Sequence, residues 1–214
     1  MRSKKIELYK KELKLNSIQR QILVGLLLGD GHLESVTAGR THRLKVEYSK
    51  KQEGYALWLW EIFNEWVRTP PRQRTKTLPS GTTISIVEFT TYSSGIFRFY
   101  TQQFYKNGKK VIPDIIRKLL TPLGLAVWFM DDGSWKSDLH RTYIIHTDGY
   151  AKKDLLTIQK VLREKFGIDV TLHRQYTNWR IYIKTESAQR FRKLIEPYII
   201  PSMRYKLGNK KPKE

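Results

Sequence analysis

The amino-acid sequence predicts an α+β protein built from two similar halves. Two nearly all-apolar helical segments, over residues 18–28 and 122–130, each run into an aspartate–glycine pair. The same series of patterns follows each segment: an alternating strand, an amphipathic helix and a hairpin. A series repeated in this way indicates an internal duplication. The chain has 214 residues, 40% of them hydrophobic, which is enough to bury a core without disulfides.

The elements of the first half follow from local patterns. Asn16 or Ser17 is expected to cap the first apolar helix. Residues 43–48 alternate between polar and apolar side chains, which predicts a strand with one core face. An amphipathic helix over residues 55–66 and a hairpin around the Pro-Ser-Gly turn at residues 79–81 complete the series.

The second half repeats this order. Thr121, followed by a proline, is expected to cap the second apolar helix. A strand over residues 143–147, a helix over 152–166 and a hairpin over 170–184 follow. Alternation places one set of hairpin side chains in the core: Val170, Leu172, Ile181 and Ile183.

We divide the chain into two repeats. Residues 1–120 form the first repeat with a basic N-terminal segment, and residues 121–214 form the second repeat with a basic C-terminal tail. The repeats are not expected to be free domains, because each carries an apolar helix that must be buried.

The charge balance points to a polyanionic partner. Lys and Arg number 40 against 20 Asp and Glu, a formal charge of +20 with a pI near 10. Solubility alone is usually met by a net charge of about 2 to 8 in a small domain, so nucleic acid is the favoured partner. No apolar run reaches the roughly 18 residues needed to cross a bilayer, and we expect no membrane partner.

Residue types exclude several chemistries. Without cysteine the chain has no disulfides, thiolate zinc sites or cysteine nucleophiles. The five histidines have no H-E-x-x-H or other clustered ligand spacing, and no Walker or dinucleotide-binding glycine motif is present. Metal chemistry would therefore depend mainly on oxygen ligands.

Asp30 and Asp132 are the candidate metal ligands. Both lie at the carboxyl ends of helices, where the peptide dipoles disfavour a carboxylate unless a cation offsets its charge. Two such helices packed side by side would bring the carboxylates together, an arrangement that suits Mg²⁺. Gly25 and Gly29 would allow close approach. In the alternative interpretation each Asp-Gly merely ends a helix with a left-handed glycine cap, but the duplication of the whole series favours function.

The two helix ends resemble the motif of the LAGLIDADG homing endonucleases in their single-chain, two-repeat form, and are similar to organellar intron-encoded members. The motif copies are Leu-Val-Gly-Leu-Leu-Leu-Gly-Asp-Gly at residues 23–31 and Leu-Ala-Val-Trp-Phe-Met-Asp-Asp-Gly at residues 125–133. They depart from the family pattern at Leu28 and Met130, where the name has an aspartate, and at Asp131, where a small residue is usual. The resemblance spans roughly residues 15–207.

The resemblance implies a fold and a DNA-binding surface. Each half would be αββαββα, the antiparallel sheets would form a DNA-binding saddle, and the paired motif helices would lie at its centre. The outward strand residues expected to contact DNA are Arg43, Lys45, Arg72, Arg74, Lys76, Thr83, Ser85, Thr171, His173, Arg180, Tyr182 and Lys184. For any one of them, a phosphate contact or a merely solvated strand face is about as plausible as base reading.

The resemblance also implies supporting residues around the metal. Asp30 and Asp132 match the catalytic acids, with the backbone of Gly29 and Asp131 as further ligand candidates. A lysine from each half is expected nearby. The second-half lysine is Lys206. In the first half two candidates stay open: Lys110, favoured by the family, and Lys118, favoured by a Pro-to-Lys spacing of five shared with Lys206. Glu47 would order water, with Gln175 as its counterpart.

Together with the resemblance, these residues predict a monomeric homing endonuclease. It would hydrolyse both strands of a long DNA target with Mg²⁺ and serve intron mobility. Mn²⁺ is expected to substitute, and Ca²⁺ to support binding without cleavage. Its own intron RNA is a second candidate partner, because an RNA-binding intron maturase is the alternative function. A structural RNA-binding or transcription-factor module is a further rival. The resemblance suggests a mitochondrion or other organelle, although the N-terminal segment itself does not locate the protein.

Overall fold

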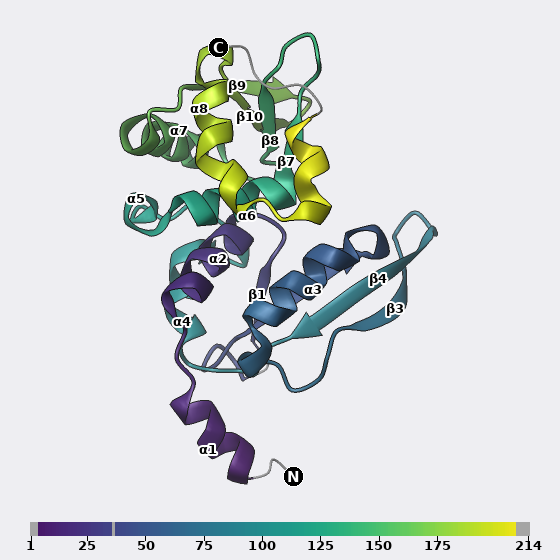
Figure 1. Cartoon of the computed structure of the whole chain (residues 1–214). Helices are drawn as coiled ribbons and strands as arrows, with labels where there is room; N and C mark the ends of the chain where they lie inside the picture. Colours follow the sequence, from purple (N-terminus) through teal and green to yellow (C-terminus); the bar gives the residue numbers. More distant parts are fainter. Residues whose placement is uncertain (1–3, 36, 209–214) are drawn as a thin grey trace. The chain divides into compact units, whose positions relative to one another are not determined.

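The computed structural model describes residues 4–35 and 37–208 (Figure 1). The basic C-terminal tail from residue 209 onward lies outside the described residues. Contacts divide the chain into two compact units. The first unit comprises Met1–Arg20 and Asp30–Thr101, and the second comprises Gln21–Gly29 and Gln102–Glu214. These units are defined by contacts in space, whereas the predicted repeats, residues 1–120 and 121–214, are defined by sequence. The repeat boundary between residues 120 and 121 therefore stays a prediction.

The first unit is built on a four-stranded antiparallel sheet. Its strand order is β1-β2-β4-β3, and helix α3 contacts β2 and β4 (Figure 1). The elements are α1 (Lys4–Glu12), β1 (His32–Glu34), β2 (Arg43–Ser49), η1 (Lys50–Gln52), α3 (Glu53–Ile62), η2 (Asn64–Trp66), β3 (Arg72–Thr77) and β4 (Thr83–Thr90). Helix α4 (Phe97–Phe104) crosses from the first unit into the second.

The core of the first unit lies between the sheet and α3. Val46 and Tyr48 of β2 are buried, and the rings of Tyr48 and Tyr55 lie 4.9 Å apart. The predicted helix over residues 55–66 is present but breaks at Phe63, and a short 3-10 turn carries the buried Trp66. Leu57, which belongs to the predicted helix, is exposed on the outer side of α3.

The second unit repeats the same order of elements on a second antiparallel sheet, β7-β8-β10-β9. Helix α7 contacts β9, and α8 contacts β10 and α6 (Figure 1). The elements are the greater part of α2 (Ser17–Leu28), β5 (Tyr105–Lys106), β6 (Lys109–Lys110), α5 (Ile116–Leu119), α6 (Pro122–Asp132), β7 (Gly133–Trp135), β8 (Tyr143–His146), α7 (Lys152–Phe166), β9 (Val170–Gln175), β10 (Asn178–Ile183), α8 (Thr185–Ile195), η3 (Glu196–Tyr198) and η4 (Pro201–Leu207). The αββαββα series is thus confirmed in both halves.

The helix starts form as their sequences predict. Of the two candidates before α2, Asn16 is the cap, because its Oδ1 accepts the Gln19 N–H at 2.9 Å and Gln19 Oε1 accepts the Asn16 N–H at 3.0 Å. Thr121 Oγ1 accepts the Gly124 N–H at 3.1 Å, with proline at the first position of α6.

Helices α2 and α6 pack closely in the second unit because glycine lies at the contact. A Cβ on Gly25 would lie 2.4 Å from the carbonyl oxygen of Gly124 and 2.6 Å from Cβ of Val127. Closer to the helix ends, a Cβ on Gly29 would lie 2.3 Å from Oδ2 of Asp131. The predicted role of Gly25 and Gly29 is confirmed. The space left by Gly29 also explains how α6 can carry an aspartate at position 131.

The glycines of the two Asp-Gly pairs have a different role from the left-handed cap considered above. Within the described residues, neither Gly31 nor Gly133 has a positive φ. Gly133 is instead needed for space, because a Cβ there would lie 2.0 Å from the ring of Phe129. The interpretation of these pairs as simple left-handed helix caps is therefore wrong.

One strand of the first hairpin faces the opposite way from the prediction. Paired residues of an antiparallel ladder share a face, and Ile84 and Ile86 pair with Lys76 and Arg74. Ser85 pairs with Thr75, and Thr83 with Thr77, on the opposite face from the basic residues. The apolar–polar alternation changes sides at Ile86 and Val87, which are adjacent and both buried. In the second hairpin the predicted alternation is confirmed by the register and by the burial of Val170, Ile181 and Ile183.

None of the described helices combines the length and the apolar character that crossing a bilayer requires.

Candidate functional site

Asp132 is the last residue of α6, in the second unit. Its half-buried carboxylate accepts a hydrogen bond from the indole N–H of Trp128, one turn earlier, at 3.0 Å from Nε1 to Oδ2. This bond orients the carboxylate at a helix end where the peptide dipoles are unfavourable to negative charge. A cation at this place would offset both the carboxylate and the dipole.

Asp30 lies in the first unit, two residues after α2 ends, and is exposed. It opens onto a hollow of about 410 Å³ whose walls come from β1, β2 and the turn that follows β2. The lining residues are Asp30, His32, Lys45, Glu47, Tyr48, Ser49 and Gln52. The first-unit hollow thus contains the predicted acid and the predicted water-ordering residue Glu47.

Two lysines make equivalent contacts beside the two aspartates. Lys110 Nζ donates to the carbonyl oxygen of Gly29, the residue before Asp30. Lys206 Nζ donates to the carbonyl oxygen of Asp131, the residue before Asp132, at 2.7 Å. These carbonyls belong to helix ends that lack intrahelical partners. Both contacts lie within the second unit.

Among the described residues, the alternative first-half lysine makes no such contact. Lys118 lies on the short helix α5 with its side chain exposed. The Pro-to-Lys spacing of five favoured Lys118, but the two lysines lie in different kinds of structure. Lys118 is in the α-helix α5, whereas Lys206 is in the 3-10 helix η4. The geometry therefore favours Lys110.

The carboxyl end of α2 is also held by a tyrosine. The Tyr150 hydroxyl donates to the carbonyl oxygen of Leu28 at 2.9 Å. Burial raises the pKa of Tyr150, and the nearby charge of Asp132 raises it further. The hydroxyl therefore stays protonated and available as a donor at neutral pH. Tyr150 was not predicted from the sequence, which offers no local signal for this long-range contact.

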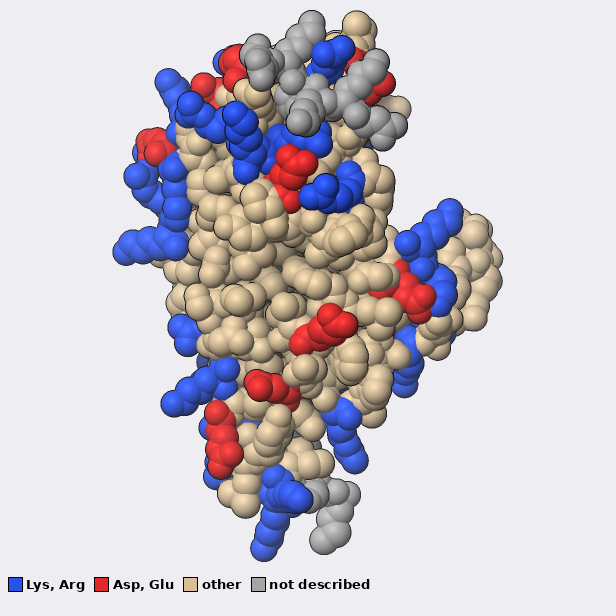
Figure 2. Space-filling model, viewed as in Figure 1, with Lys and Arg blue, Asp and Glu red and all other residues tan. Residues whose placement is uncertain are grey.

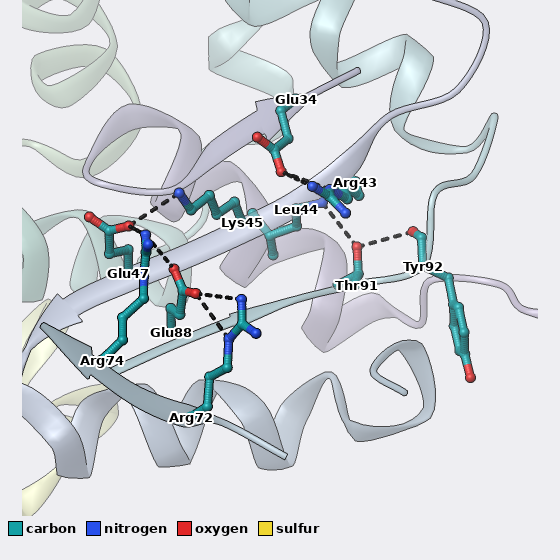
Figure 3. Close-up of polar contacts among 10 residues, drawn as sticks. All are labelled: Glu34, Arg43, Leu44, Lys45, Glu47, Arg72, Arg74, Glu88, Thr91 and Tyr92. Atoms are coloured by element: carbon teal, nitrogen blue, oxygen red, sulfur yellow. Dashed lines mark hydrogen bonds and ion pairs between the residues drawn. The ribbon is translucent and has the colours of Figure 1, made fainter. Parts of the chain in front are cut away.

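Glu47 is held among cations on the polar face of the first sheet. Its carboxylate pairs with Lys45 at 3.1 Å and with Arg74 at 3.4 Å (Figure 3). It also pairs with Lys76. Burial raises the pKa of Glu47, but the hydrogen bonds from Lys76 and Lys45 outweigh it and lower the pKa below its usual value. Glu47 is therefore ionised at neutral pH.

The second-sheet position that matches Glu47 is His146. On the first sheet His32 pairs with Lys45, two residues before Glu47, and on the second sheet Ser134 pairs with Ile144, two residues before His146. Gln175, predicted as the counterpart, instead lies exposed at the end of β9 and pairs with Asn178. The register therefore corrects the assignment.

His146 lies among polar and charged groups of the second unit. Its Nε2 is 3.0 Å from Oγ of Ser134. Burial lowers the pKa of His146, as do the charges of Arg180 and Lys206, against an opposing effect of Asp148. The sequence does not point to His146 by histidine spacing, because a single histidine on a strand forms no clustered ligand pattern. Counting strand positions from each Asp-Gly pair would have found it.

The predicted DNA-contacting residues divide by face. Arg43, Lys45, Arg72, Arg74 and Lys76 share the polar face of the first sheet, while Thr83 and Ser85 lie on the other face. On the second sheet the predicted residues Thr171, His173, Arg180 and Tyr182 share one face, and Lys184 follows β10.

Arg43 and Arg180 each form an ion pair with an acidic residue. Arg43 pairs with Glu34 at 2.7 Å (Figure 3). Arg180 lies 3.5 Å from Asp148, and within the described residues its buried Nε has no hydrogen-bond partner.

No group of three or more histidine, aspartate and glutamate side chains that could hold a metal ion occurs among residues 4–35 and 37–208. The helix ends offer the carboxylates of Asp30 and Asp132 with neighbouring backbone carbonyls, and the Asp131 side chain also lies at the end of α6, close to Gly29. These are hard oxygen ligands of the kind that Mg²⁺ prefers.

Comparisons with known proteins place the chain in a family. A profile of the LAGLIDADG DNA endonuclease family matches residues 20–191. A probable intron-encoded endonuclease 1 of Wickerhamomyces canadensis is 31% identical over 96% of this chain and 90% of that protein. The cytochrome b mRNA maturase bI2 of Debaryomyces hansenii is 30% identical over 88% of this chain and 73% of that protein.

A solved structure agrees with the fold. The homing endonuclease I-WcaI, bound to its DNA recognition sequence, superposes with a TM-score of 0.88 at 29% identity, over 96% of this chain and 93% of that one. The family profile extends over both motif copies and both sheets, and the strand order of the two sheets repeats as the duplication requires. The chain belongs to the LAGLIDADG DNA endonuclease family.

Proposed function

We propose that this chain binds a long double-stranded DNA site and hydrolyses both strands, using divalent metal ions held at Asp30 and Asp132. The observation that carries the proposal is the matched pair of lysine contacts, from Lys110 and Lys206 to the carbonyls that precede the two acids. A duplex has two strands to cut. Two equivalent sets of acid and lysine within one chain suit that task, and a monomer would suffice.

The two acids fit the proposed metal. Mg²⁺ is usually bound by one or two carboxylates together with water and substrate phosphates. Asp30 is exposed and Asp132 is half-buried, so solvent reaches both residues. When bound, the metal would polarise the scissile phosphates, stabilise the leaving oxygens and lower the pKa of attacking water. Mn²⁺ is expected to substitute. Ca²⁺ is expected to support binding without cleavage.

Backbone oxygens extend the donor set. The carbonyls of Gly29 and Asp131 each accept one lysine hydrogen bond. A carbonyl oxygen has two lone pairs, so it can accept a hydrogen bond from a lysine and also contact a metal ion. We therefore keep both carbonyls as candidate ligands beside the acids.

The lysines would stabilise charge that grows on the phosphates. Each ammonium group lies at the end of a motif helix, where it offsets the negative end of the peptide dipole. Fixed positive charge at the place where negative charge develops is the usual means of lowering such a barrier. Glu47 and His146 would order water, one in each half.

The test begins with a cleavage selection from a randomised DNA library in Mg²⁺, which identifies the target. Asp30→Asn and Asp132→Asn are then each expected to abolish double-strand cleavage of that target while retaining the fold and DNA binding. Asp114→Asn, which removes an exposed carboxylate far along the sequence, is the matched control and should cut normally. Full cleavage by either helix-end variant would overturn the metal assignment. Rapid cleavage in Ca²⁺ alone would contradict the proposed ion preference.

An intron maturase is a second candidate function, supported by the similarity to the bI2 maturase. Lys and Arg side chains gather over α7 and α5 (Figure 2). The exposed basic residues of these helices include Arg117, Lys118, Lys152, Lys153, Lys160 and Arg163. Specific binding of intron RNA by Asp30→Asn, with splicing retained, would establish this function independently of cleavage. We also propose intron mobility as the biological purpose of cutting.

A further inference from the structure

Two carboxylates lie among the basic residues on the polar face of the first sheet (Figure 3). Glu47 of β2 and Glu88 of β4 are register partners, so their side chains share the polar face. The group that surrounds them consists of Lys45, Arg72, Arg74 and Lys76. Two negative charges at the centre of this face would weaken its attraction for phosphate, so phosphate binding alone does not explain them.

Glu88 is the more deeply placed of the two. Its side chain is 6% exposed, whereas those of Arg72 and Arg74 are 76% and 45% exposed. Glu88 Oε1 accepts from Arg72 Nη2 at 2.9 Å and from Nε at 3.1 Å, and Oε2 lies 3.0 Å from Arg74 Nη2. Both carboxylate oxygens are thus occupied, so Glu88 is poorly placed to contact a base itself.

The same contacts leave the arginines able to bind DNA. A guanidinium has five N–H donors, and Glu88 engages two of those of Arg72. The remaining N–H donors of Arg72 are available to DNA, and the hydrogen bonds to Glu88 already fix the orientation of the guanidinium. Holding a long side chain in place before binding lowers the entropy lost on binding.

A buried carboxylate also discriminates between ligands of the arginines. A phosphate brings a negative charge toward Glu88 and is repelled, whereas the acceptors on a base edge, such as O6 and N7 of guanine, are neutral. We propose that Glu88 is a positioning residue for DNA specificity, which holds Arg72 and Arg74 for base edges and disfavours their contact with phosphates. This inference rests on the proposed DNA-binding function.

The first test compares wild type with Glu88→Gln, a change that removes the charge and preserves the shape. Binding is measured in Ca²⁺ without Mg²⁺, on the sequence that wild type selects from a randomised duplex library and on random duplex. The variant should bind random duplex more tightly and lose about tenfold in specificity ratio, as for one weakened base contact. Its log-log salt slope should steepen by about 0.9 for each phosphate gained. Glu61→Gln makes the same charge change on the exposed side of α3 and should match wild type.

A double-mutant comparison shows whether Glu88 acts through the arginines. In an Arg72→Ala, Arg74→Ala background, Glu88→Gln should no longer alter the specificity ratio. An unchanged ratio and salt slope in Glu88→Gln alone, or an effect that persists without the arginines, would overturn the proposal.

A second measurement applies if Glu88→Gln fails to fold. Arg72→Ala and Arg74→Ala should lose preference at particular base pairs with little change in salt slope. A uniform loss across sequences, with the slope reduced by about 0.9 for each arginine, would mean phosphate contact and would overturn the proposal. Failure of the proposed function looks different: wild type would select no duplex, or would bind its selected duplex specifically but never cut it in Mg²⁺.

Discussion

The two sheets have the same strand order but different side chains at matching positions. Where the first sheet pairs Glu47 with Glu88, the second pairs His146 with Arg180. The pair on the first sheet is therefore acidic and surrounded by cations. The pair on the second sheet consists of an arginine and a histidine, and burial lowers the pKa of that histidine. The duplication conserved the backbone and the helix ends while the faces diverged. Such a chain suits a DNA site whose two halves differ.

The largest expected effect tests whether the two lysines serve different strands. Lys206→Met should slow cleavage of one strand about a hundredfold, and Lys110→Met the other, because each removes charge stabilisation from one transition state. Nicked plasmid should accumulate in both variants, and separate labels on the two strands measure the two rates.

Lys118→Met is the control for the first-half lysine and should cut both strands at the wild-type rate. If Lys118→Met instead yields the nick complementary to that of Lys206→Met, Lys118 is the first-half lysine. Equal slowing of both strands by Lys206→Met, without a nicked intermediate, would refute one lysine per strand.

The next prediction concerns what the halves share, the packing of α2 against α6. Gly25→Ala would place a methyl group 2.4 Å from a backbone carbonyl and should reduce the free energy of unfolding by about 1–3 kcal/mol. Gly95→Ala, where a Cβ would meet no atom within 4 Å, should change it by less than about 0.5 kcal/mol. Urea denaturation followed by circular dichroism measures both. Equal midpoints for the two variants would argue against close helix packing.

A third prediction sharpens the difference between strand faces. Arg180→Ala should relax preference at particular base pairs by about 1–3 kcal/mol, since the register places its side chain on the polar face. Ser85→Ala should leave preference unchanged, because the register turns Ser85 to the opposite face. Selection profiles of bound sequences measure both changes. A comparable change in the Ser85 variant would show that the first hairpin binds DNA through its other face.

The smallest expected effect is a pH dependence of stability. The pKa of His146 is lowered, chiefly by burial, so below about pH 6.5 the unfolded chain binds a proton that the folded chain resists. Stability should therefore fall as pH drops from neutral through this range, and fall less in His146→Gln. His42, whose pKa burial also lowers, should contribute in the same direction. Thermal unfolding from pH 7.5 to pH 5 provides the measurement. An identical pH profile in His146→Gln would exclude this contribution.

The sequence alone determined the features that depend on neighbours along the chain. The duplication, the helix over residues 152–166 and the two motif helices all came from periodicity and capping, which act over a few residues. Gly25 and Gly29 were predicted as contact residues because their spacing on one helix face is fixed by helix geometry.

Only the tertiary structure decided features that depend on register and distant partners. Ile84 and Ile86 lie on the same face as the basic residues of β3. The sequence pattern alone leaves this orientation ambiguous, because Ile86 and Val87 are adjacent and both buried. Only the pairing with β3 resolves it. His146 and Glu88 likewise acquire their positions from strands far apart in the sequence. Lys110 contacts the carbonyl of Gly29, which is 81 positions away in the sequence. No local sequence pattern encodes this contact, because only the folded chain brings the two residues together.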